Sequence, residues 1–129
     1  MKRVTGIGGI FFKAKDPASL RAWYKRHLGI DVQPWGGAAL RWADDPNAPA
    51  GGTTAWSVFP TDSDQFAPSQ STFMINYRVA DLPALLAALR SEGCNVLEKT
   101  SDDADYGKFG WVMDPEGNKI ELWQPPPGK

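Results

Sequence analysis

Two stretches of the chain, GIFFKAKDPASL (residues 9–20) and FMINYRVADLPALL (residues 73–86), share one pattern that decides the fold. In each, an apolar strand leads into an aspartate that precedes a helical stretch, and these residues, Asp16 and Asp81, are 65 positions apart. Aspartate is a strong helix N-cap. A fixed period in a short chain indicates one supersecondary unit used twice, with neither copy able to bury its apolar face alone. We therefore expect two equivalent units that share a cavity.

Each unit is expected to run strand, helix and then three strands. The elements expected in the first unit, residues 5–60, are a strand at 7–15, a helix from Asp16 to Gly29, and strands near 30–33, 38–43 and 53–59. Those expected in the second unit, residues 72–125, are a strand at 73–79, a helix at 82–92, and strands at 95–99, 107–113 and 119–124. Two βαβββ units with antiparallel hairpins predict one α+β domain over residues 1–129, with a curved, mostly antiparallel sheet around a cavity.

Apolar residues recur at helical spacing in both helical stretches, which predicts that each helix buries one stripe against the sheet. The residues of these stripes are Leu20, Trp23, Tyr24, His27 and Leu28 in the first helix and Leu82, Leu85, Leu86 and Leu89 in the second.

Composition excludes several classes of protein. A net charge of −1 argues against a phosphate-binding surface and hence against nucleic-acid binding. No window approaches 18 consecutive apolar residues, and the MKRVTG start lacks the apolar core of a signal peptide. The single cysteine, Cys94, excludes an internal disulfide and fits a reducing compartment. We therefore expect a cytoplasmic protein that binds neither nucleic acid nor membrane.

Two motifs carry a resemblance to a known superfamily. The first helix reads D-x-x-x-L-x-x-W-Y-x-x-x-L-G over residues 16–29, and WVMDPEGNKIELW occupies residues 111–123. Together with the paired units, they resemble the vicinal oxygen chelate superfamily, which contains glyoxalases, bleomycin-resistance proteins and extradiol dioxygenases. The resemblance covers nearly the whole chain, and the segment around residues 114–122 is its most specific part. It implies the glyoxalase-like fold. It does not imply one particular function, because one fold hosts many chemistries.

The same resemblance implies where a metal would bind. Metal-using members place ligands on the first and fourth strands of each unit, which correspond here to Gly9, Met74, Trp56 and Glu121. Only Glu121 can coordinate a hard or borderline divalent ion. Glycine has no side chain, the tryptophan N–H cannot coordinate a metal, and the methionine thioether favours soft copper(I). A divalent catalytic site needs about three protein ligands. We therefore expect a cavity with no metal ligands and no cofactor.

Strand alternation predicts which other side chains face this cavity. The candidate ligand-binding residues are Phe11, Lys13, Trp56, Met74, Asn76, Arg78 and Trp123, with Glu121 as the candidate catalytic group. Apolar walls with a few convergent polar groups are typical of a small-molecule pocket. A second interpretation gives Glu121 only an ion pair with Arg78 or Lys13. Trp56 and Met74 can also be read as side chains that merely fill volume.

Three functions remain open at this point. The first is a metal-free small-molecule-binding protein similar to the antibiotic-sequestering members. The second is a metal-independent lyase or isomerase in which Glu121, desolvated by aromatic neighbours, removes a proton next to a carbonyl while Arg78 or Lys13 stabilises the enolate. Glyoxalase I activity ranks below both, because that reaction uses a metal to polarise its substrate.

The resemblance and the exposed tryptophans also imply a homodimer. Whether the units pair within one chain or across two is left open. The acidic stretch at residues 101–105 is expected to be a solvated loop, with a mobile lid over the pocket as the alternative.

Overall fold

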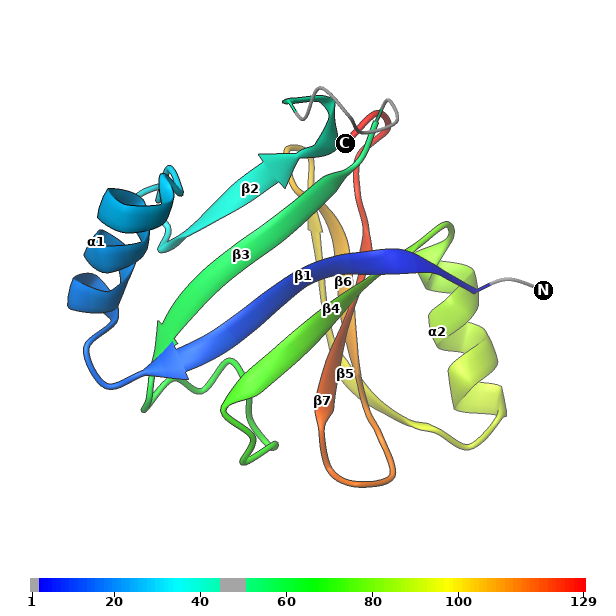
Figure 1. Cartoon of the computed structure of the whole chain (residues 1–129). Helices are drawn as coiled ribbons and strands as arrows, with labels where there is room; N and C mark the ends of the chain where they lie inside the picture. Colours follow the sequence, from blue (N-terminus) through cyan, green and yellow to red (C-terminus); the bar gives the residue numbers. More distant parts are fainter. Residues whose placement is uncertain (1–2, 45–50) are drawn as a thin grey trace.

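The computed structural model describes residues 3–44 and 51–129. Its elements in chain order are β1 (Val4–Ala14), α1 (Pro17–Leu28), β2 (Gly37–Arg41), the 3₁₀ turn η1 (Trp42–Asp44), β3 (Thr53–Pro60), β4 (Phe73–Val79), α2 (Leu82–Ser91), β5 (Asn95–Asp103), β6 (Gly107–Met113) and β7 (Lys119–Gln124). The strands form one seven-stranded sheet in the order β2-β3-β1-β4-β7-β6-β5 (Figure 1).

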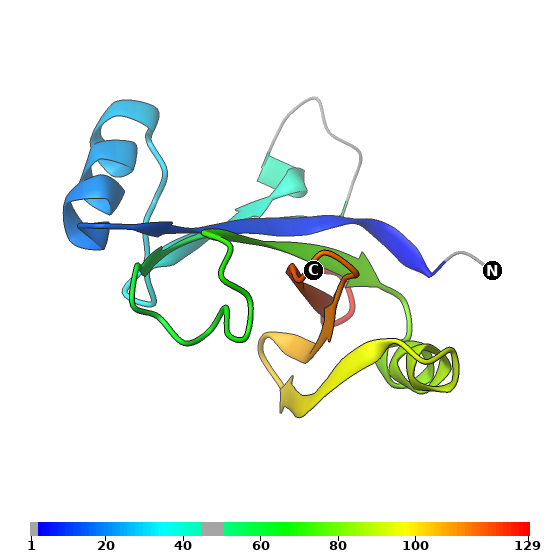
Figure 2. The same cartoon turned by 90° about the horizontal axis from the view of Figure 1, so that it is seen from below.

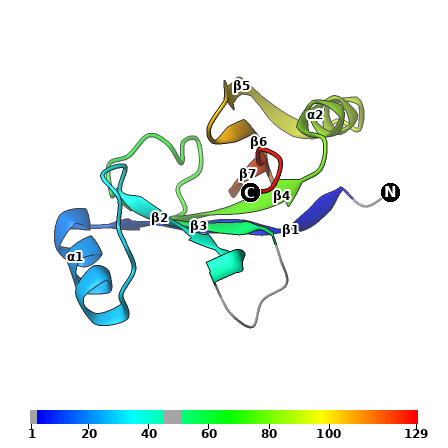
Figure 3. The same cartoon turned by 90° about the horizontal axis from the view of Figure 1, so that it is seen from above.

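The pairing pattern confirms the expected α+β architecture. β1 pairs with β3 and β4 with β7 in parallel, whereas the remaining four neighbour pairs, including β1–β4 between the two units, are antiparallel. The two units therefore pair within one chain. The sheet is curved, because β5 and β6 turn to the side on which the loop of residues 61–72 lies (Figures 2 and 3). We call that concave side the inner face and the opposite side the outer face.

Both helices begin in the same way, as the repeat predicts. The Asp16 side chain accepts a hydrogen bond from the Ser19 backbone N–H at 3.1 Å, and Asp81 accepts one from Ala84 at 3.1 Å. Each aspartate thus satisfies a backbone donor that the helix itself leaves without a partner. α1 ends at Gly29, whose φ of 67° is a left-handed conformation that glycine adopts without a steric penalty.

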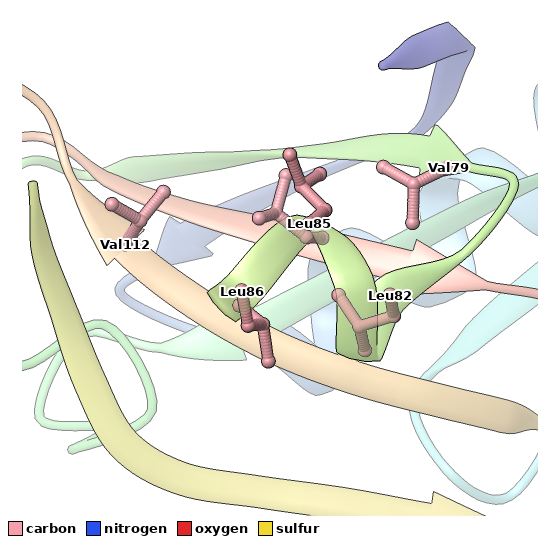
Figure 4. Packing of buried hydrophobic residues seen from close by; sticks show 6 residues of the cluster. Val79, Leu82, Leu85, Leu86 and Val112 are labelled. Carbon is pink, nitrogen blue, oxygen red and sulfur yellow. The ribbon is translucent and has the colours of Figure 1, made fainter. Parts of the chain in front are cut away.

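The second helix packs on the outer face of its own unit. Leu82, Leu85 and Leu86 are buried against side chains of β4, β6 and β7 (Figure 4). The full cluster consists of Val79, Leu82, Leu85, Leu86, Val112 and Leu122, with Tyr77, Leu89, Val96 and Ile120 partly buried around it. The stripe expected on this helix is confirmed.

The first unit departs from expectation in two respects. Residues 30–33 form no strand, so the described part of the first unit has three strands where four were expected. The buried stripe expected on α1 is wrong for Trp23, which is half exposed, and for His27, which is exposed; Leu20 and Tyr24 are partly buried, and the burial of Leu28 lies outside what the structure describes. The two departures are related. α2 packs over β5, the edge strand of the second unit, whereas the equivalent strand is missing beneath α1, so α1 lacks that surface to pack against.

The acidic stretch also differs from the expected loop. Ser101, Asp102 and Asp103 continue β5 and pair with β6, so only residues 104–106 connect the two strands. The lid interpretation therefore does not fit the first half of this stretch. Asp103 accepts hydrogen bonds from the backbone N–H groups of Asp105 and Tyr106, which closes the short turn.

A second core fills the centre of the inner face. Phe66, carried by the loop of residues 61–72, is fully buried and packs with Phe11 and Met74. Phe59 and Trp111 contact the edge of this cluster. Because the loop inserts a phenylalanine here, the middle of the curved sheet is packed, and any open pocket must lie to one side of it.

Candidate functional site

Glu121 lies on the inner face of β7, directly opposite Asn76 on β4. Asn76 Nδ2 donates to Glu121 Oε1 at 2.7 Å, and Trp111 Nε1 donates to Glu121 Oε2 at 3.0 Å. Only 7% of Glu121 is exposed. The strand register explains this arrangement, because Trp111 of β6 and Asn76 of β4 are the two cross-strand neighbours of Glu121. Both carboxylate oxygens are therefore held by neutral donors in a nearly buried position.

Burial raises the pKa of the Glu121 carboxyl above its ordinary value, because it removes water from the charged form. The hydrogen bonds from Asn76 and Trp111 and the charge of Lys119 act in the opposite direction without reversing the shift. A carboxyl in this environment can hold or release a proton at a higher pH than an exposed glutamate does.

The ion-pair interpretation of Glu121 is wrong, because both candidate partners are engaged elsewhere. Lys13 Nζ lies 5.2 Å from the centre of the Phe66 ring. Arg78 donates to the backbone oxygens of Thr53 at 3.0 Å and Lys129 at 2.6 Å. Its guanidinium also lies 5.6 Å from the Trp42 ring and 5.3 Å from the Trp123 ring.

Trp56 was expected beside Glu121, and the structure places it on the other face of the sheet. Its ring packs on Tyr24 of α1 at 5.0 Å and on Phe12 at 5.7 Å. The register shows the cause: Phe11 pairs with Ser57 in the first unit as Asn76 pairs with Glu121 in the second. Ser57 is thus the counterpart of Glu121, and an offset wrong by one residue reverses the face of a strand.

The remaining predicted residues share the inner face without forming one open cavity. Phe11 and Met74 are buried in the cluster around Phe66, and for Met74 this matches the alternative interpretation that its side chain fills volume. Trp123 is buried at the far end, where it stacks on Phe109 at 6.0 Å and donates to the Tyr106 carbonyl at 2.7 Å. The structure therefore brings Glu121 together with Asn76, while the other candidates lie around this pair at greater distances.

A pocket of about 250 Å³ is lined in part by Trp111, whose indole N–H donates to the buried carboxyl. Its lining residues are Asp64, Gln65, Ala67, Leu97, Lys99, Trp111 and Lys119. None of them is among the candidate site residues predicted from the sequence, although strand alternation from Glu121 places Lys119 on the same face. Trp111 could have been found, because a hairpin closed by the tight turn at residues 114–118 pairs it with Glu121.

A larger hollow of about 540 Å³ lies along α1, but it is a shallow groove open to solvent. It contains exposed faces of Ser19 and Trp23 and no buried titratable group. The pocket beside Trp111 is smaller, yet its lining residue Trp111 donates a hydrogen bond to the carboxyl whose pKa is raised by burial. For this reason we regard the Trp111 pocket as the candidate site.

The residues at the superfamily's metal positions do not fit a divalent ion. With Ser57 in place of Trp56, these positions hold Gly9, Met74, Ser57 and Glu121, which supply one carboxylate. Both oxygens of that carboxylate already accept hydrogen bonds. Among residues 3–44 and 51–129, no three His, Cys, Asp or Glu side chains gather closely enough to hold a metal. We derive no reaction step through a metal.

Comparison with known proteins agrees with this fold. The chain matches the family model described as "Glyoxalase-like domain" over residues 9–123. It therefore belongs to the glyoxalase-like domain family, within the vicinal oxygen chelate superfamily. The sequence matched none of the curated proteins with which it was compared.

Solved structures show the same fold at low sequence identity. Methylmalonyl-CoA epimerase from Mycobacterium tuberculosis is 20% identical, with a TM-score of 0.67 over 98% of this chain and 92% of the epimerase chain. A methylmalonyl-CoA epimerase in complex with methylmalonyl-CoA and NH4+ is 18% identical, with a TM-score of 0.68 over 98% of both chains. The 2,3-dioxygenase LapB from Pseudomonas sp. KL28 is 17% identical, with a TM-score of 0.65 over 97% of this chain and 42% of that chain.

Neither helix in the part of the chain that the structure describes has the length and apolar character needed to span a membrane.

Proposed function

We propose that this protein binds a small molecule in the pocket beside Trp111 and does so without a metal ion. One observation carries the proposal: the pocket adjoins Trp111, whose indole N–H holds the buried carboxyl of Glu121. A pocket that combines an aromatic wall with a few polar side chains and lies near a group with a perturbed pKa is the usual arrangement of a ligand site. The volume of about 250 Å³ suits a metabolite or one part of a larger ligand.

Thermal unfolding with and without candidate ligands tests this proposal. A compound that binds only the folded protein raises the unfolding midpoint. The screen should use protein treated with a chelator, and hits should then be repeated with Trp111→Ala. Trp23→Ala, on the exposed face of α1, is the matched control. We expect hits to survive metal removal and the control substitution and to be lost in Trp111→Ala. Hits that require added metal would contradict the proposal.

The second candidate function is an enzyme in which Glu121 acts as a general base on a proton next to a carbonyl. The raised pKa of its carboxyl favours this function, because it makes the carboxylate a stronger base than that of an exposed glutamate. Neither Arg78 nor Lys13 contacts Glu121, so enolate stabilisation would fall to the Asn76 amide, the Trp111 N–H or Lys119. Glu121→Gln separates the two functions: turnover would be lost with binding retained in an enzyme.

We also propose that the protein forms a homodimer in the cytoplasm. Apolar side chains on the outer face of β1 and β4 are exposed between the two helices: Val4 (40%), Ile7 (45%), Ile10 (42%) and Phe73 (46%). Contiguous exposed apolar side chains often mark an interface. Analytical ultracentrifugation should show a dimer for the wild type and for Ser101→Lys, and a monomer for Ile10→Lys. A wild-type monomer would contradict this part of the proposal.

A further inference from the structure

Two lysine ammonium groups lie at the same aromatic ring in the candidate pocket. Lys119 Nζ is 5.4 Å and Lys99 Nζ is 6.0 Å from the centre of the Trp111 ring. Both residues line the pocket, and they come from different strands, β7 and β5. Lys119 Nζ also donates to the Gln65 backbone oxygen at 2.7 Å, which holds its charge at the pocket wall.

The charged side chains that line this pocket are not balanced in sign. Asp64 is the one acidic side chain among the lining residues, against Lys99 and Lys119. Burial lowers the pKa of Lys119, and the neighbouring charge of Lys99 lowers it further, while Glu121 and Asp64 act in the opposite direction. Two ammonium groups near one another are stabilised by an anion placed between them. The unliganded pocket therefore favours a negatively charged guest.

The rest of the lining restricts what kind of anion fits. Trp111, Leu97 and Ala67 supply apolar surface, and the indole ring offers a flat face. Apolar and aromatic walls favour an organic body, whereas inorganic anions are bound by polar groups and backbone N–H donors.

We propose that the pocket binds a small organic carboxylate, with its carboxylate group between Lys99 and Lys119 and its planar or apolar body against Trp111 and Leu97. This inference rests on the proposed function and names the ligand class of that same site. It adds Lys99 and Lys119 as specificity-determining residues, and neither is among the candidate site residues predicted from the sequence.

Titration followed by NMR of the indole N–H signals tests the inference. The probes are benzoate, its uncharged analogue benzamide, and inorganic phosphate, and Trp111→Phe assigns the Trp111 signal. We expect benzoate to shift this signal and benzamide to bind at least about tenfold more weakly. Lys99→Gln and Lys119→Gln should each weaken benzoate binding by about three- to tenfold. Lys25→Gln, on exposed α1, is the control and should change nothing.

The outcomes separate this inference from the proposed function. Equal binding of benzoate and benzamide at Trp111 would overturn the carboxylate inference and leave the small-molecule pocket standing. Phosphate binding more tightly than benzoate would also overturn it. No shift with any probe would overturn the inference and would count against the pocket itself.

A second measurement does not depend on how well the lysine variants fold. Wild-type protein carrying ¹³C-labelled lysine reports the titration of Lys119 directly. Saturating benzoate should raise the Lys119 pKa, because an anion stabilises the charged ammonium. Benzamide should leave it unchanged. An unchanged Lys119 pKa in saturating benzoate would overturn the inference.

Discussion

Asn76 and Glu121 face each other across the parallel β4–β7 pair, with Asn76 Nδ2 2.7 Å from Glu121 Oε1. Asn76 is 1% exposed, and its Oδ1 has no hydrogen-bond partner among the residues described. A rotated Asn76 amide would present Oδ1 to residue 121 and could accept a hydrogen bond from a neutral carboxyl or from a glutamine. The pair can therefore satisfy either protonation state of Glu121.

Glu121→Gln is expected to make stability less dependent on pH. The folded pKa of Glu121 is raised, so the folded protein binds this proton more tightly than the unfolded chain. The resulting stabilisation is fully present below the ordinary pKa of 4.5 and is lost as the pH rises through the folded pKa. The advantage of Glu121→Gln over the wild type should thus grow with pH above 4.5 in urea unfolding. Exposed Glu98→Gln is the control, and parallel pH profiles for wild type and Glu121→Gln would contradict the account.

Trp111→Phe removes one of the two donors to Glu121 while keeping most of the ring. A buried oxygen left without its partner costs about 1–3 kcal/mol of unfolding free energy. The loss should be greater above the pKa of Glu121 than below it, because the charged carboxylate depends more on the indole N–H. Trp23→Phe, at a half-exposed position, should change the unfolding free energy little. Equal losses of unfolding free energy at acid and neutral pH would contradict a charged Glu121 carboxylate as the partner of the indole N–H.

Gly8→Ala is expected to displace Asn76. A Cβ at Gly8 would lie 1.9 Å from Asn76 Oδ1 and 2.9 Å from Trp123 Cε3, so at least one side chain must move. Overpacking of this kind costs about 1–3 kcal/mol. Gly6→Ala is the matched control on the same strand, since a Cβ there meets nothing within 4 Å. Equal stabilities of the two variants in chemical denaturation would show that Asn76 is not held where the structure places it.

Phe66→Ala tests whether the loop of residues 61–72 completes the inner core. Phe66 is fully buried against Phe11 and Met74, and truncation of a buried phenylalanine costs about 3–5 kcal/mol. Tyr106→Ala, at a side chain that is 60% exposed, should cost about 1 kcal/mol or less. Comparable losses of unfolding free energy for both variants would mean that the loop does not pack against the inner face of the sheet.

Most of the fold was predictable, because the helix caps and apolar stripes that indicate it are formed by residues close together in the sequence. The caps Asp16 and Asp81 and the leucine stripe of α2 lie where their spacing in the sequence predicts them. The strand expected at residues 30–33 is absent, because a short stretch of alternating apolar and polar residues without a partner strand has no independent preference for β structure.

The site was only partly predictable because it depends on register between distant strands. Glu121 and Asn76 meet as alternation predicts, but Trp56 faces α1 because the repeat shifts by one residue between β1 and β3. Phe66 lies in a stretch with loop composition, and nothing in that composition indicates that its ring fills the centre of the inner face.

Isothermal titration of chelator-treated protein with a compound from the thermal screen tests the central claim most directly. We expect one ligand per chain, with an affinity unchanged by metal removal, unchanged by Trp23→Ala and lost in Trp111→Ala. Binding that appears only after a divalent metal is restored, or that survives Trp111→Ala, would contradict a metal-free site at Trp111.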